Sequence, residues 1–302
     1  MSRRLSYLFL LFVLAGLLLF VPMPVTPTYF WRTFEDAGHM PLFFLVTLGV
    51  MIVLRDDRRF GGARLYVAAG LVGIGTGLLS EVIQMPLARD ASWDDVGADA
   101  VGAICALGAY ALFERRSNPP RWRRFVALVV VCTSLAIFVL PIVRMARAYV
   151  HRNGQFPVLA DFHSRIELYW TVSIGVRREI VGDALAVDLL AEDSPGVSFH
   201  EPVPDWRRFK TLLLDVENPD AAPLDLGVRV HDRRHRHVFH DRFNRRFEIA
   251  PWQRRTLRIP LEDIRHGPRD RLMDMAHISD ITLFRGASTG SRKLRIYSLR
   301  LE

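Results

Sequence analysis

Long apolar runs in the first half of the chain constrain its fold more than any other feature of the 302-residue sequence. Five such runs, separated by polar or charged connections, lie at about residues 5–21, 38–54, 65–83, 96–113 and 125–143. A helix needs roughly 20 mostly apolar residues to cross the hydrocarbon core of a bilayer. The run lengths therefore predict five transmembrane helices in residues 1–145, with the lipid bilayer as their partner.

The arginines between these runs predict the orientation of the helices. If the N-terminus is cytoplasmic, the inner connections hold Arg3 and Arg4, four arginines at 55–64 and five at 115–124, whereas the outer connections hold Arg32 and Arg89. Cytoplasmic connections carry the excess of arginine and lysine in membrane proteins. An odd number of spans then places residues after 145 outside. A cleaved signal peptide is the alternative for the first run, but its apolar part exceeds the usual h-region of about 7–15 residues.

Polar residues gather at the outer boundary of the predicted helices. Ionisable groups beside a bilayer core are costly, which makes each of them a functional-site candidate. We expect a carboxylate such as Glu81 to pair with Arg89, the basic residue of its own outer loop. A structural alternative exists for Ser92 and Asp95, whose spacing fits a capped helix start. The predicted membrane pocket comprises Asp36, His39, Glu81, Gln84, Arg89, Ser92, Asp95 and Asp99.

The order and spacing of these pocket residues resemble the VanZ-like family over about residues 29–113. The resemblance rests on the pocket residues just given together with Gly102, in the family order Asp-Lys-x-x-His-Phe, Glu-x-x-Gln, Arg, Ser, Asp, Asn and Gly. This chain departs from the pattern at Ala37, Met40 and Asp99, where Lys, Phe and Asn are usual. The resemblance implies a small polytopic envelope protein and assigns no reaction.

After residue 145 the hydrophobic period changes to two. Leu224, Leu226, Val228 and Val230 alternate with polar residues or glycine, and the segments 185–189, 212–216 and 257–261 follow the same pattern. Period-two alternation indicates half-buried strands, and turn-rich breaks such as 218–223 separate them. We therefore expect a linker at 146–155 and an all-β antiparallel sandwich at 156–302.

Several short segments of this second half resemble galactose-binding-like jelly rolls, the class that includes many carbohydrate-binding modules. They lie at 156–162, 214–219, 241–247 and 296–301, together with Trp170 and Trp252. The resemblance implies an antiparallel jelly roll with a glycan partner. Since a fold by itself does not fix function, the ligand class has to come from particular side chains.

The histidine- and arginine-rich segment 231–246 is the chemically unusual part of the second half. Its histidine spacing matches no zinc motif, and its six arginines from 233 to 246 would repel a cation, so the sequence predicts no metal site. A solvated hairpin with a basic rim is the simpler interpretation. Outside the cell such a rim suits acidic glycans or anionic headgroups, whereas nucleic acid is not an expected partner. The predicted anionic-glycan residues are Arg233, Arg236, Arg242 and Arg245.

Together these features predict a non-catalytic inner-membrane protein of the cell envelope, whose extracytoplasmic domain binds surface or lipid-linked glycan. The alternative is a membrane enzyme acting on a lipid-linked glycan or phosphate, in which Arg89 holds the anion and Glu81, His39 or Asp99 transfers protons. The sequence carries no nucleophile motif, redox pair or cofactor fingerprint, so no cofactor is expected.

Overall fold

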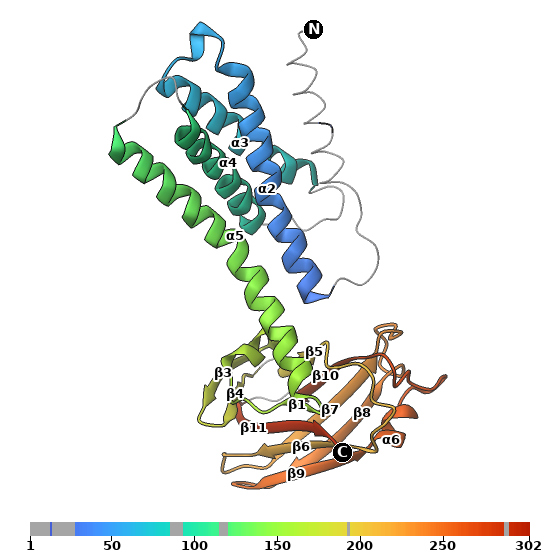
Figure 1. Cartoon of the computed structure of the whole chain (residues 1–302). Coiled ribbons are helices and arrows are strands. Elements are labelled where there is room, and N and C mark those ends of the chain that lie inside the picture. The colour runs from blue at the N-terminus through green and yellow to red at the C-terminus, as the bar shows by residue number, and fades with distance from the viewer. Residues whose placement is uncertain (1–12, 14–27, 85–92, 115–119, 192–193, 287–289) are drawn as a thin grey trace. The chain divides into compact units, whose positions relative to one another are not determined.

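The computed structural model describes residues 13, 28–84, 93–114, 120–191, 194–286 and 290–302 (Figure 1). The chain divides into two compact units, Met1–Met145 and Ala146–Glu302, which we call the helical unit and the sandwich unit. The first predicted span, at 5–21, lies outside the described residues apart from Val13.

Four described helices are long and apolar enough to cross a membrane: α2 (Tyr29–Leu54), α3 (Ala63–Gln84), α4 (Trp93–Phe113) and α5 (Arg121–Gln155). The described residues thus support four of the five predicted spans. Helix α2 starts earlier than expected because Thr28 caps it, accepting a hydrogen bond from the Trp31 amide at 3.2 Å. The segment 146–155, predicted as a linker, is helical and forms the last part of α5.

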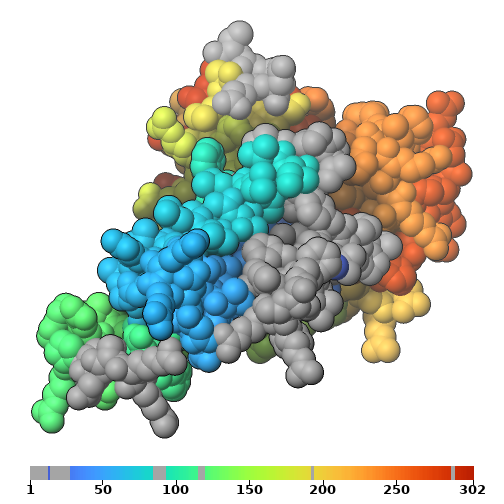
Figure 2. All heavy atoms as spheres, turned by 90° about the horizontal axis from the view of Figure 1, so that it is seen from above, coloured from blue at the N-terminus to red at the C-terminus, as the bar shows by residue number. Residues whose placement is uncertain are grey.

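The arginines at 55–64 and the start of α5 lie at one end of the described helices. The 3₁₀ helix η1 (Arg58–Phe60) joins α2 to α3 there, and α5 begins at the same end, as the blue and green regions of Figures 1 and 2 show. Since α2 and α3 run in opposite directions, the start of α2 and the end of α3 share the other end. The arginines at 55–64 and 121–124 are therefore separated along the helices from His39, Glu81 and Asp99.

Small residues allow the helices of this unit to pack closely. A Cβ atom on Gly102 of α4 would lie 2.2 Å from the Met40 carbonyl oxygen of α2, and one on Gly73 of α3 would lie 2.2 Å from Thr47 Oγ1. Both distances are far below van der Waals contact, so a Cβ at Gly102 would clash with backbone and one at Gly73 would force the Thr47 side chain to move. Close backbone approach through small residues is the usual way in which membrane helices associate.

The sandwich unit consists of two antiparallel sheets. The first sheet has the order β3 (Val176–Val181), β4 (Ala184–Leu189), β11 (Arg292–Leu301), β6 (Thr211–Glu217) and β9 (Arg254–Pro260), with β1 (Val158–Ala160) paired to β11. The second sheet has the order β2 (Thr171–Ile174), β5 (Gly196–His200), β10 (Ile278–Arg285), β7 (Leu224–Asp232) and β8 (Phe243–Ile249). The short helices η3 (Arg165–Trp170) and α6 (Leu261–Arg265) join strands. This arrangement is consistent with the predicted jelly-roll class.

One hydrophobic core lies between the two sheets. The predicted alternation places Leu224, Leu226, Val228 and Val230 of β7 in this core, facing residues of the first sheet such as Leu214. Strands β4, β6 and β9 coincide with the other segments of period two. The period-two pattern located these strands because apolar side chains that face the core alternate along each of them with residues on the opposite face.

Candidate functional site

A cluster of one histidine and two carboxylates lies inside the helical unit. His39 of α2 and Asp99 of α4 are in contact, with 3.0 Å between Nδ1 and Oδ1. Glu81 of α3 joins them, and one ligating atom from each residue lies within 4.8 Å of the other two. The Asp99 side chain is 1% exposed and Glu81 is 4% exposed. Three helices thus bring three of the predicted pocket residues together in a buried position.

Glycine on α3 makes the space for this cluster. A Cβ atom on Gly77 would lie 2.7 Å from Asp99 Oδ2, closer than real Cβ atoms come to other atoms. Gly77 precedes Glu81 by four residues, so the two share one helix face. That face of α3 supplies the Glu81 carboxylate and, one turn earlier at Gly77, leaves room for the Asp99 carboxylate.

Two of the other predicted pocket residues, Asp36 and Asp95, are not in the group of three that the described residues form. Asp36 is exposed on α2 and lines a separate cavity of about 310 Å³ with residues of α4 and α5. Asp95 is half-buried one turn before Asp99, and Gln84 is the last residue of α3. Arg89 and Ser92 lie outside the described residues, so the proposed pairing of Glu81 with Arg89 remains a prediction.

The second sheet of the sandwich unit carries polar side chains on its outer face. The strand register aligns Ser198, Thr282, Arg229 and Asn244 in one row across β5, β10, β7 and β8. The next row holds His200, Asp280 and His231. Ser198 and Thr282 hydroxyls are 2.9 Å apart. We call this surface the polar face.

Asp280 lies between two histidines on the polar face. Its Oδ2 is 3.1 Å from His200 Nδ1, its Oδ1 is 3.9 Å from His231 Nε2, and its side chain is almost fully buried. Burial raises the pKa of Asp280. Burial, aided by the neighbouring His235, lowers the pKa of His231 to about 4. His231 is therefore neutral at pH 7 and offers one donor and one acceptor.

An aromatic ring and two arginines adjoin this row. The Arg229 guanidinium lies 4.7 Å from the Phe284 ring centroid, and Gly227 leaves room for that ring, since its Cβ would come within 2.5 Å of it. Burial lowers the pKa of both Arg229 and Arg242. The Nε atoms of both arginines are buried without a hydrogen-bond partner among the described residues. The polar face therefore combines an apolar ring with unused hydrogen-bonding capacity.

The four arginines predicted to bind an anionic glycan lie on the β7–β8 connection and on β8. Arg233 and Arg236 are exposed, and Arg242 lies over the Phe239 ring at 5.3 Å. Arg236 and Arg245 have acidic neighbours, Asp241 at 3.7 Å and Asp263 at 2.8 Å. Part of the positive charge of this rim is therefore already balanced.

The base of the β7–β8 connection is held by a residue that the sequence did not indicate. Arg271 donates to both oxygens of Asp232, at 2.6 and 2.8 Å, and to Asp241 at 2.6 Å. Both carboxylates are buried, and the hydrogen bond from Arg271 lowers the pKa of Asp241 to about 2. The solvated-hairpin prediction fits the exposed tip of this connection but not its buried base. No sequence pattern links Arg271 to residues 30 or more positions away.

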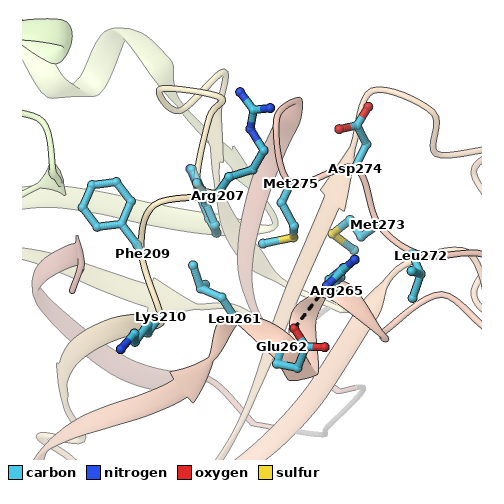
Figure 3. Close-up of a pocket in the computed structure, with 11 residues that line it drawn as sticks. Arg207, Phe209, Lys210, Leu261, Glu262, Arg265, Leu272, Met273, Asp274 and Met275 are labelled. Carbon is cyan, nitrogen blue, oxygen red and sulfur yellow. Dashed lines mark ion pairs between the residues drawn. The ribbon is translucent and has the colours of Figure 1, made fainter.

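A pocket of about 530 Å³ lies elsewhere in the sandwich unit, beside α6 (Figure 3). Leu261, Met273 and Met275 line it, and Glu262 and Arg265 pair across its edge at 3.6 Å. At its rim, Arg207 is already paired with Asp205 through two hydrogen bonds. Because Arg207, Glu262 and Arg265 already have partners and the floor of this pocket belongs partly to the core, it offers less to a polar ligand than the polar face does.

Searches for protein families and curated proteins find no match to this sequence. Carbohydrate-binding modules and agarases are similar in structure over the C-terminal region. A family 11 module from Clostridium thermocellum, solved with a β-1,3-1,4-mixed-linked tetrasaccharide, is 15% identical, with 48% of this chain and 93% of that chain covered and a TM-score of 0.39. A family 29 module is 13% identical, with 43% and 76% covered and a TM-score of 0.31.

An agarase is 18% identical over 48% of this chain and has a TM-score of 0.40. This chain covers only 26% of that agarase, and 22% of another similar structure, PfGH50B. Identities this low, with TM-scores below 0.5, assign this chain no activity.

Proposed function

We propose that this protein is a non-catalytic membrane component of the cell envelope whose sandwich unit binds glycan on the polar face. The juxtaposition of Phe284 and Arg229 with the His200–Asp280–His231 row carries the proposal. Sugar rings present apolar C–H faces for an aromatic ring and hydroxyl pairs for neighbouring donors and acceptors. A few placed polar groups beside an apolar surface are the usual composition of such sites.

The charge of the polar face and its rim favours an acidic glycan. Burial lowers the pKa of Arg242, and repulsion from the nearby Arg229 guanidinium adds to the effect. A carboxylate or sulfate on a sugar would relieve this repulsion by pairing with the guanidinium groups. Arg233, Arg236 and Arg245 border the same surface and would extend the contact along a polysaccharide.

The helical unit would anchor this domain in the membrane. The proposal includes a cytoplasmic N-terminus, an extracytoplasmic sandwich unit in or near the inner membrane, and a fifth span in the residues before α2. The positive-inside distribution of arginines supports that orientation, and the VanZ-like pattern of residues 29–113 supports an envelope protein. Residues 1–145 and 156–302 would then be two domains that share the α5 connection.

A second candidate is the membrane enzyme, and the contact between His39 and Asp99 favours it. A histidine held by a carboxylate is a common acid–base pair, and its burial beside Glu81 would keep the site dry. In this version the substrate is a lipid-linked glycan or phosphate. Turnover of such a lipid by the purified chain, lost in His39→Ala, would favour the enzyme over the glycan-binding component.

Glycan binding can be tested on residues 146–302, which we expect to fold alone, and on the full chain in detergent. We expect binding to an acidic polysaccharide on a glycan array, and at least about 10-fold weaker binding in Arg229→Ala and Phe284→Ala, equivalent to about 1.4 kcal/mol each. High salt should weaken the interaction, since exposed ionic contacts are screened.

Arg254→Ala provides a matched control, because Arg254 stacks on Tyr297 at 3.5 Å in the first sheet. It removes the same kind of pair from the other sheet and should leave binding unchanged. Equal losses in Arg229→Ala and Arg254→Ala, or binding that neither variant alters, would show that the polar face is not the site.

A further inference from the structure

We infer that His39, Glu81 and Asp99 bind one divalent transition-metal ion within the helical unit, with Zn²⁺ as the leading candidate. One imidazole nitrogen and two carboxylates are a ligand set that Zn²⁺ accepts, and softer thiolate ligands are absent from the described cluster. No metal-binding motif is recognisable in the sequence here, because the three ligands are contributed by three different helices.

The distances within the cluster suit a metal after small side-chain rotations. Zn–N and Zn–O bonds of about 2.0–2.2 Å place tetrahedral ligands roughly 3.3–3.5 Å apart. His39 Nδ1 and Asp99 Oδ1 are 3.0 Å apart, and all three ligating atoms lie within 4.8 Å of one another. These separations bracket the required spacing, and three protein ligands would leave the fourth position open for water or substrate.

A buried carboxylate oxygen that has no hydrogen-bond donor among the described residues points to the ion. Asp99 Oδ2 is inaccessible to solvent and has no hydrogen-bond partner among the described residues. The other oxygen of the same carboxylate faces His39. A buried carboxylate oxygen is costly unless a donor or a cation reaches it, and Gly77 keeps the space beside it open.

The charge of the ligand set is also matched to a divalent ion. Two carboxylates and one neutral imidazole carry a formal charge of −2, which M²⁺ cancels. A neutral complex costs much less to bury beside hydrocarbon than two separate anions. A different cation, such as the guanidinium of Arg89, would achieve the same balance without metal, and the experiment has to separate the two.

The test uses the full chain in detergent, stripped with chelator, reloaded with Zn²⁺ and freed of excess metal. We expect the native chain to retain one more equivalent of Zn²⁺ than Asp99→Asn and His39→Gln, measured by mass spectrometry of the metal. Zn²⁺ should raise the melting temperature of the native chain but not of these variants, since a ligand that binds the folded state stabilises it. Any Zn²⁺ bound by the histidines at 231–240 is common to all variants. The difference in bound Zn²⁺ between the native chain and the variants therefore reports on His39 and Asp99 alone.

Glu114→Gln serves as the matched control, because Glu114 is a carboxylate just beyond α4 that accepts a hydrogen bond from Tyr66 at 3.0 Å, away from the cluster. It should bind as much Zn²⁺ as the native chain. Because a variant could fail to fold, Co²⁺ loading of the native chain adds an independent measurement, with the visible bands of a tetrahedral nitrogen–oxygen site expected. Equal Zn²⁺ in the native chain and Asp99→Asn, without such bands, would overturn the proposal and favour neutralisation by Arg89.

Discussion

Replacing Arg271 with alanine tests whether the base of the β7–β8 connection depends on one guanidinium. The substitution removes three charge-assisted hydrogen bonds from Asp232 and Asp241. Breaking a buried ion pair costs about 3–5 kcal/mol. Both carboxylates keep backbone donors, from Asp274 at 2.7 Å and Arg236 at 2.8 Å. We therefore expect a smaller loss in unfolding free energy, about 2–4 kcal/mol.

For a domain of this size, such a loss lowers the melting temperature by about 5–15 °C. Thermal unfolding of residues 146–302, followed by circular dichroism at pH 7, measures it. Arg234→Ala is the control, since the exposed Arg234 lies 3.8 Å from Asp274 and should contribute less than about 1 kcal/mol. A melting temperature of Arg271→Ala within about 2 °C of the native value would refute the reasoning.

Three further predictions concern pH, helix packing and topology. Because the folded-state pKa of His231 is lowered from 6.5 to about 4, the sandwich unit should keep its full stability above pH 6.5 and lose about 2–3 kcal/mol as pH falls toward 4. His231→Gln should flatten this part of a denaturation–pH profile, and an unchanged slope would contradict the assignment. Gly102→Ala should destabilise the detergent-solubilised chain, because the added methyl group clashes with the Met40 carbonyl. Gly97→Ala is the control, since open space surrounds Gly97. Equal melting temperatures of the two variants would contradict the α2–α4 packing. A periplasm-only reporter fused after Glu302 should be active, and activity of a cytoplasm-only reporter there would reverse the proposed orientation.

The sequence predicted elements whose pattern repeats locally. Leu224 to Val230 revealed β7 because one face of that strand is buried, and the apolar runs revealed α2 to α5 because each is long. Strand β5 is harder to recognise, since Gly196 and Ser198 are buried together with Val197 and Phe199, which removes the alternation. Element ends were less predictable, as the extension of α5 to Gln155 shows.

The sequence identified His39, Glu81 and Asp99 individually from their polarity within apolar surroundings. Their mutual contact depends on the rotation of three helices about their axes, which Gly77 and Gly102 permit and hydropathy does not encode. Contacts of Asp280 with His200 and His231 depend in the same way on strand register. Arg271 lies in an irregular segment without periodicity, so only the folded chain reveals its two buried partners.

The place of β11 in its sheet has a consequence for biogenesis. This strand is synthesised after every other described strand, yet it lies between β4 and β6 and also pairs with β1, more than 130 residues earlier. Until it arrives, the β3–β4 hairpin and the β6–β9 ribbon have no strand to join them. Such non-local pairing delays folding, so the sandwich unit would complete its fold only after β11 has been synthesised. Meanwhile the open edges of β4 and β6 would be exposed to aggregation and to chaperones.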